Sequence, residues 1–270
     1  MTQITARSTG FSFQLARSAA VIATMTSSAV LGLWSAQAQA AEVTVAVAAN
    51  VQYAFDDLAQ AFTRETGTPV KPVFNSSGKF TAQIQNGAPF DVFLSADTHY
   101  PQHLADQGLA ASTPVVYAKG QLVLWTLSPT LQLDDWQAAL KNSTGKIAVA
   151  NPKLAPYGRE AMRVLEQQNL AGPLTPRLVF GESISQTNQY IYSQAAELGF
   201  TAKSVVVSPE MRGKGRWLAI PPALYQPIEQ AMIVTRHGAA SQPEASRRFA
   251  EFMRGPQARR ILEAHGYLVP

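Results

Sequence analysis

The chain has 270 residues, with 22 Lys and Arg, 18 Asp and Glu, and a formal net charge of +4. It contains no cysteine, which excludes disulfides, thiol catalysis and cysteine metal sites. The basic residues are dispersed, and a charge so close to neutral does not indicate binding to nucleic acid or to a membrane surface.

The first forty residues have the pattern of a secretory signal peptide. Arg7 and Arg17 supply positive charge, residues 19–33 are apolar and small, and Ala38-Gln39-Ala40 fits the cleavage rule. Removal of residues 1–40 leaves 230 of the 270 residues and a charge of +2, because two positive residues go with them. The alternative is an uncleaved membrane anchor, for which the apolar stretch is short.

Residues 43–62 predict a strand that leads directly into a helix. The first part, VTVAVAA, is small and β-branched, as expected of one buried strand. From Val51 to Phe62 apolar residues recur with helical spacing, and Asn50 stands before them as a preferred N-cap residue. Such a helix start presents unpaired N–H groups and a positive dipole end, which suit an anion.

The same pattern recurs up to residue 108. A strand over 69–74 runs through Asn75-Ser76-Ser77-Gly78 into a helix that Asn86-Gly87 closes. Residues 88–97 form a turn, a buried strand and a polar stop, and a short helix over 98–107 ends at Gly108.

The stretch 121–127 is strongly β-forming and marks where the chain leaves the first lobe, because the alternation of strands and helices restarts after it. The stretch 225–235 ends in a strand and returns the chain. Between them we predict helices from 134, over 156–168 and over 185–197, and strands over 146–150, 177–180, 198–200, 204–207 and near 213–220. Two helices follow the return, over 243–254 and 256–264.

This alternation predicts an α/β fold with mostly parallel sheets. Two crossings predict two lobes: lobe I from 41–120 and 226–270, and lobe II from 121–225. Such a hinge allows the lobes to close over a ligand. Ligands of open α/β sheets bind at the carboxyl ends of strands, which is where the four strand-to-helix loops lie.

Several segments carry a resemblance to a known family. Ala48-Ala49-Asn50 ends the first strand, Phe74-Asn75-Ser76-Ser77-Gly78 precedes the second helix, and residues 82–97 read AQIQNGAPFDVFLSAD. Residues 147–152 (IAVANP), 155–158 (APYG) and 254–258 (RGPQA) extend the match. Together they resemble the periplasmic molybdate-binding proteins of ABC importers over nearly the whole chain after residue 40, and the run GAPFDVFLSAD is the most specific part.

The resemblance implies a two-lobe type II periplasmic binding fold with two hinge crossings. It implies that a tetrahedral oxyanion, molybdate and also tungstate, is held between the lobes by neutral hydrogen-bond donors and delivered to a membrane permease. A periplasmic protein of this kind is not an enzyme and needs no cofactor. We expect a monomer without a nucleic-acid partner.

Matched position by position, the resemblance assigns four ligand-binding residues. Asn50 offers its backbone N–H and side-chain amide in the first loop, and Ser77 offers N–H and Oγ–H in the second. Tyr157 and Ile184 offer backbone N–H groups in the third and fourth loops. Some family members add a tyrosine hydroxyl where this chain has Ala202, and we expect the Asn50 amide to replace it.

The chemistry of the anion agrees with such a site. A dianion without protons only accepts hydrogen bonds, so its site should contain donors and no carboxylate, whereas protonated phosphate also needs an acceptor. We therefore expect Lys79 and Arg159, which lie beside two of the loops, to be solvated, and Glu182 to point away from the anion.

Other functions remain open from the residues alone. The same fold can bind sulfate, phosphate or ferric ion, and binding-protein lobes also occur in regulatory proteins. A hydrolase using Ser77 would need a histidine base, but none of the four histidines lies near the loops. His99 and His103 have zinc-ligand spacing, but the Glu of H-E-x-x-H is absent. Tyr190 and Tyr192 could hold ferric ion as tyrosinates, but their spacing puts them on different helix faces.

Overall fold

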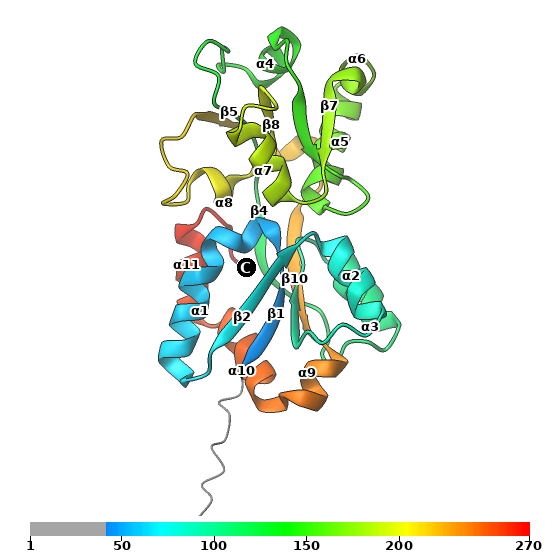
Figure 1. The fold of residues 1–270 in the computed structure, drawn as a ribbon, viewed down its shortest axis with the longest axis vertical. Coiled ribbons are helices and arrows are strands. Elements are labelled where there is room, and N and C mark those ends of the chain that lie inside the picture. The colour runs from blue at the N-terminus through cyan, green and yellow to red at the C-terminus, as the bar shows by residue number, and fades with distance from the viewer. Residues whose placement is uncertain (1–41) are drawn as a thin grey trace, which may run out of the picture. The chain divides into compact units, whose positions relative to one another are not determined.

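The computed structural model describes residues 42–270, so the predicted signal peptide lies outside the described residues. Two five-stranded sheets organise this part of the chain, in the orders β2-β1-β3-β10-β4 and β7-β6-β8-β5-β9 (Figure 1). The first sheet contains β1 (Val43–Ala48), β2 (Val70–Asn75), β3 (Val92–Leu94), β4 (Val115–Gly120) and β10 (Ile228–Val234). The second contains β5 (Leu122–Thr126), β6 (Ile147–Ala150), β7 (Leu178–Gly181), β8 (Leu198–Ala202) and β9 (Arg216–Ala219).

Each sheet has one strand that runs against the other four. In the first sheet β10 is antiparallel to β3 and β4, and in the second β5 is antiparallel to β8 and β9. The remaining pairs are parallel. The chain passes between the sheets from β4 to β5 and again from β9 to β10. The predicted α/β fold with mostly parallel sheets is confirmed, and we refer to the first sheet with its helices as lobe I and to the second as lobe II.

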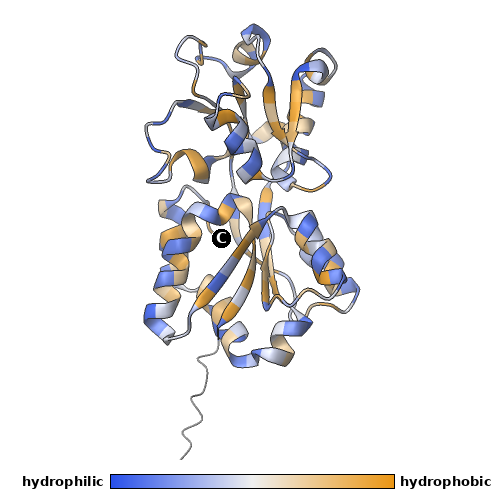
Figure 2. Ribbon diagram, in the orientation of Figure 1, coloured by the Kyte–Doolittle hydropathy of each residue, from blue (hydrophilic) through white to orange (hydrophobic). Residues whose placement is uncertain are grey.

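Helices cover both faces of the first sheet. Successive side chains of its strands point to opposite faces, and apolar residues on both faces pack against helices. Val43, Val45 and Val47 of β1 share one apolar cluster with α1 (Gln52–Thr66), α10 (Pro243–Arg254) and α11 (Pro256–Ala264). Ala46 packs on the other face with residues of α2 (Ser77–Gln85) and α3 (His99–Asp106). These helices present apolar residues to the sheet and polar residues outward (Figure 2).

The second sheet is covered in the same way. Leu122 and Leu124 pack with α4 (Trp136–Asn142), α5 (Pro156–Gln167) and α6 (Ala171–Leu174). Val123 and Trp125 pack on the other face with α7 (Ile184–Tyr192) and α8 (Lys203–Val206). No helix within residues 42–270 is long and apolar enough to cross a membrane.

Most predicted elements agree with the structure, but α6 was not predicted, and the helix predicted over 185–197 ends at Tyr192. The two terminal helices have the predicted bounds, and Gly67 ends α1 in the left-handed conformation at φ 71°. The strand predicted over 204–207 is wrong: these residues lie largely in α8, where the Ser204 hydroxyl donates to the Asn50 carbonyl. β4 and α9 (Arg236–Ser241) were not predicted.

Candidate functional site

The four strand-to-helix loops meet at one small cavity, with two loops from each lobe. Its volume is about 10 Å³, far less than the roughly 300–1,000 Å³ of a drug-sized ligand site. A cavity of this volume has room for roughly one water-sized sphere, so the arrangement excludes a drug-sized ligand. The cavity is lined by Ala48, Ala49, Asn50, Ser76, Ser77, Ala96, Ala155, Pro156, Tyr157 and Ile184.

All four residues predicted from the sequence thus line the same cavity. None of the lining residues, all from the described part of the chain, carries a charge. Larger and more open depressions lie beside α10 and α11, where arginine and glutamate side chains surround them, but none of the four loops contributes to those.

Backbone N–H groups at helix starts are the first kind of donor at the cavity. Ser77, Tyr157 and Ile184 lie in the first turns of α2, α5 and α7, where an N–H has no acceptor in its own helix. Pro156 has no N–H, so Tyr157 supplies the first donor of α5. In the fourth loop the Ser183 side chain caps α7 by accepting from the Gln186 N–H at 3.3 Å, and the Ile184 N–H is left for another acceptor.

The first loop differs from its prediction in detail. Asn50 is not the N-cap of a helix but the middle residue of a 3-10 turn, η1 (Ala49–Val51), between β1 and α1. At this position its N–H has no acceptor within the turn, because the turn's bonds are donated by later residues.

The Asn50 side-chain amide, which we expected at the anion, has other partners in the structure. Its Nδ2 donates to Gln230 Oε1 at 2.8 Å and to the Tyr267 hydroxyl at 3.1 Å, which uses both of its hydrogens. The side chain therefore points into lobe I, toward Gln230 and Tyr267. The Asn50 backbone N–H is what remains for an anion.

Two hydroxyl groups add to the backbone donors. The Ser77 Oγ accepts from the Ala96 N–H at 3.0 Å, and its own hydrogen remains to be donated. The Ser76 Oγ is buried and has no hydrogen-bond partner within residues 42–270. The family resemblance assigned Ser77 and not Ser76, because two adjacent serines before a helix look alike in the sequence and only the structure shows which of them is bonded.

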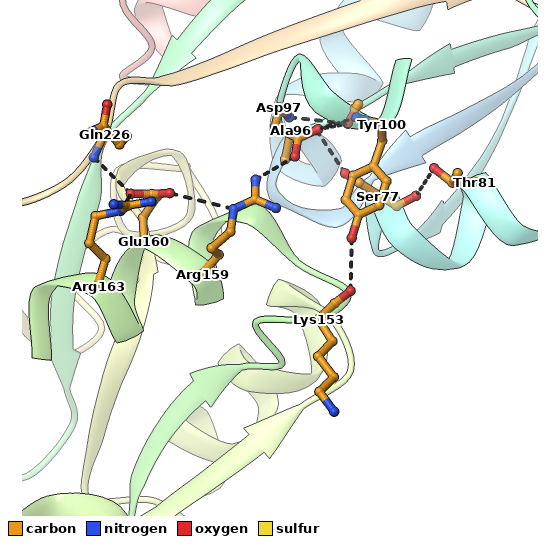
Figure 3. A network of polar contacts seen from close by, with 11 residues as sticks. Ser77, Thr81, Ala96, Asp97, Tyr100, Lys153, Arg159, Glu160, Arg163 and Gln226 are labelled. Atoms are coloured by element: carbon orange, nitrogen blue, oxygen red, sulfur yellow. Dashed lines mark hydrogen bonds and ion pairs between the residues drawn. The ribbon is translucent and has the colours of Figure 1, made fainter. Parts of the chain in front are cut away.

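The charged residues near the loops pair with one another across the lobes. Arg159 Nη2 lies 2.6 Å from Asp97 Oδ2, and Lys79 forms an ion pair with Glu182. Figure 3 shows the first of these pairs beside the hydroxyl of Tyr100, which donates to the Lys153 carbonyl at 3.0 Å.

None of these charged side chains lines the cavity. Nearby, the backbone N–H of Gly78 donates to the Leu154 carbonyl at 2.9 Å, again from one lobe to the other. The two lobes are thus in contact around the cavity.

Tyrosines behind the cavity are kept neutral. Burial raises the pKa of Tyr157 and Tyr117 well above the ordinary value, and it raises the pKa of Tyr267 to about 12. Their hydroxyls therefore remain protonated at pH values at which exposed tyrosines already ionise.

Among the described residues, the alternative zinc site at His99 and His103 lacks further metal-binding side chains, and the alternative hydrolase site at Ser77 lacks a base. His103 contacts Gln85 and Gln107, and its ring stacks on His99, but no group of three or more metal-binding side chains occurs in residues 42–270. The hydrogen bonds of Ser77 involve Ala96 and Thr81, neither of which can act as a base.

Comparisons with known proteins agree on one family. The profile described as bacterial extracellular solute-binding protein matches residues 43–268. The chain is 40% identical over 238 residues to the molybdate-binding protein ModA of Azotobacter vinelandii, covering 87% of this chain and 93% of that protein. It is 38% identical to ModA of Rhodobacter capsulatus, covering 88% and 92%. The solved structure of the periplasmic molybdate-binding protein of A. vinelandii matches with a TM-score of 0.80 at 35% identity, covering 84% of this chain and 99% of that one.

Proposed function

Because the chain belongs to the ModA family of bacterial extracellular solute-binding proteins, we propose that it holds molybdate in the cavity between the four loops by uncharged N–H and O–H groups. Membership of the family makes the protein the substrate-binding component of a molybdate ABC importer, which delivers its ligand to a membrane permease. It is a transport protein and not an enzyme, and molybdate is its ligand rather than a cofactor.

One observation supports this mode of binding above the others. Asn50, Ser77, Tyr157 and Ile184, whose backbone N–H groups have no acceptor in their own helices, line one small cavity whose lining residues carry no charge. Ser76 and Ser77 add two hydroxyl donors. Each hydrogen bond to a charged group contributes on the order of 1.5–3 kcal/mol, and each helix start roughly 0.3–2 kcal/mol, so neutral donors suffice to hold a dianion.

The cavity also discriminates between anions. Molybdate and tungstate have the same charge and nearly the same size, so we propose that both bind. Phosphate at neutral pH carries a proton that needs an acceptor, and the cavity lining offers no carboxylate. Ferric ion would need anionic ligands, which the lining also lacks. Sulfate is distinguished only by its smaller size.

We further infer where and in what state the protein acts. The pattern of residues 1–40 supports export to the periplasm, where the related A. vinelandii protein works. One chain supplies all four loops, so a monomer forms a complete site. The closed arrangement makes every contact at once, and for this reason binding favours closure of the lobes.

The test is titration calorimetry of dialysed protein against sodium molybdate, tungstate, sulfate and phosphate. We expect dissociation constants of about 1 µM or below for molybdate and tungstate, and binding at least about a hundredfold weaker for sulfate and phosphate. Sulfate binding tighter than molybdate would contradict the proposal. From the calorimetric stoichiometry we expect one site per chain. Sedimentation of the same samples should show a monomer.

A further inference from the structure

A buried polar network lies behind the cavity, and Gln230 of β10 is at its centre. The Gln230 Oε1 accepts from Asn50 Nδ2 at 2.8 Å and lies 3.0 Å from the Tyr117 hydroxyl, which donates to it. Its Nε2 donates to the Tyr157 hydroxyl at 3.1 Å. All of these side chains are buried, and Gln230 has 0% exposure. One amide therefore bonds to a cavity residue of lobe I and to a cavity residue of lobe II.

The backbone around Gln230 is shaped for these contacts. Gln230 pairs with Ala118 and Ala231 with Val116, so that Tyr117 is the extra residue of a β-bulge in β4. Bulges re-aim side chains and are common beside functional sites. Here the bulge accompanies the bond between the Tyr117 hydroxyl and Gln230.

A glycine leaves room for the same contacts. A Cβ added to Gly120, the last residue of β4, would overlap the Tyr157 hydroxyl and lie 2.6 Å from Gln230 Nε2. Gly120 stands at the point where the chain leaves the first sheet. The contact between Tyr157 and Gln230 therefore depends on a residue without a side chain at the crossing between the lobes.

We propose that Gln230 is a positioning residue for the anion site, which holds the Asn50 loop and the Tyr157 loop at the separation that their backbone N–H groups require. Gln230 does not line the cavity and acts only through these two residues. The inference rests on the proposed function, because it assumes that the two N–H groups bind the anion.

The chemistry of an amide explains why glutamine serves here. Asn50 presents a donor and Tyr157 presents an acceptor, and the glutamine amide bonds to the two at once because it carries both an acceptor and a donor without a charge. The second hydrogen of Asn50 Nδ2 is donated to the Tyr267 hydroxyl. This hydroxyl in turn donates to the backbone carbonyl of Asn50 at 2.8 Å. Loss of the Tyr157 hydroxyl leaves Gln230 Nε2 buried without a partner, and the loops relax to satisfy it, whereas Gln230 Oε1 keeps Asn50 as a partner when the Tyr117 hydroxyl is lost.

Two tyrosine variants form a matched pair that tests this role. Tyr157→Phe and Tyr117→Phe each remove one buried hydroxyl bonded to Gln230, and neither removes a backbone N–H. The Tyr157 bond joins the two lobes, whereas the bonds of Tyr117, to Gln230 and to the Ser95 carbonyl, stay within lobe I. We expect Tyr157→Phe to weaken molybdate binding at least about tenfold and Tyr117→Phe to change it by less than about threefold, with similar losses of melting temperature.

Gln230→Met supplies a second variant of similar volume that removes both polar atoms. We expect it to weaken binding at least about tenfold, and the double variant with Tyr157→Phe to be no more than about threefold weaker again, because both changes break the same contact. Additive losses in the double variant, or equal affinities of the two tyrosine variants, would overturn the inference. Wild-type protein that fails to bind molybdate would instead overturn the proposed function.

Discussion

Ser76 and Ser77 are adjacent in the sequence but have different bonding environments. The Ser77 hydroxyl accepts from a buried backbone N–H, that of Ala96, while the Ser76 hydroxyl is buried without a partner among the described residues. A buried hydroxyl without a partner costs stability, and such groups in folded proteins call for an explanation. An anion in the cavity would accept from both hydroxyls, so the stability cost of Ser76 would be recovered when the ligand binds.

This difference predicts opposite effects of two alanine substitutions on stability. Ser76→Ala and Ser77→Ala should each weaken molybdate binding at least about tenfold, because each removes a donor to a dianion. Ser77→Ala should also lower the melting temperature of the ligand-free protein, since the Ala96 N–H loses its acceptor, at a cost of about 1–3 kcal/mol.

Ser76→Ala should leave the melting temperature of the ligand-free protein unchanged or raise it slightly, because Ser76 makes no side-chain cap bond to α2. Calorimetric titration and thermal melts of the ligand-free variants measure both quantities. Unchanged affinity of Ser76→Ala would remove Ser76 from the donor set, and a large drop in its melting temperature would show that the hydroxyl is bonded in the free protein.

At the scale of helices and strands, the position of α5 depends on one glycine. A Cβ at Gly158 would overlap the carbonyl oxygen of Ala150, the last residue of β6. The first turn of α5 therefore approaches the end of β6 as closely as a backbone allows. This approach places the Tyr157 N–H, one residue earlier, at the cavity.

Gly158→Ala should move the start of α5 away from β6. We expect a loss of about 1–3 kcal/mol of stability from the overlap and molybdate binding at least about tenfold weaker, because the Tyr157 N–H moves with the helix. Gly172→Ala in α6 is the control, since no heavy atom lies within 4 Å of a Cβ there, and it should leave stability within about 0.5 kcal/mol and affinity unchanged. Equal effects of the two substitutions would show that the close approach at Gly158 does not matter.

The elements predicted correctly from the sequence are those with local signals. Proline and glycine bound α10 and α11, and Gly67 ends α1, so their ends were readable. The strand predicted over 204–207 followed the β-branched residues there, but contacts of Ser204 with Asn50, 154 positions away, favour a helical turn instead.

The candidate site was predictable only in part, for the same reason. Its four loops follow from strand-to-helix patterns and from the family resemblance. The partners of the Asn50 amide are separated from it by 180 and 217 positions, and no local pattern indicates them. Gln230 and Tyr267 therefore became visible only in the structure.

At the scale of the whole described chain, buried tyrosine hydroxyls gather where the two lobes join. Tyr157 of lobe II bonds to Gln230 of lobe I, the Tyr267 hydroxyl contacts Ser204, and the Tyr225 hydroxyl accepts from the Leu122 N–H at the other crossing. Burial raises the pKa of each of these tyrosines. Ionisation of these hydroxyls therefore opposes the folded state of the junction.

These shifts predict a loss of stability at alkaline pH. The folded-state pKa of Tyr267, about 12, lies above the unfolded value near 10, so the stability that it contributes is complete below about pH 10 and falls as the pH rises from there through about 12. Tyr117 and Tyr157 act in the same direction.

Melting temperatures should therefore be nearly constant between about pH 7 and 9 and fall steeply above about pH 10. Absorbance of tyrosinate, recorded with circular dichroism on the same samples, separates buried from exposed groups. Part of the signal of the eight tyrosines should appear only as the protein unfolds. Full tyrosinate absorbance near pH 10 in a protein whose circular dichroism is still native would contradict the raised pKa values. The buried hydroxyls at the junction would then ionise while the protein stays folded.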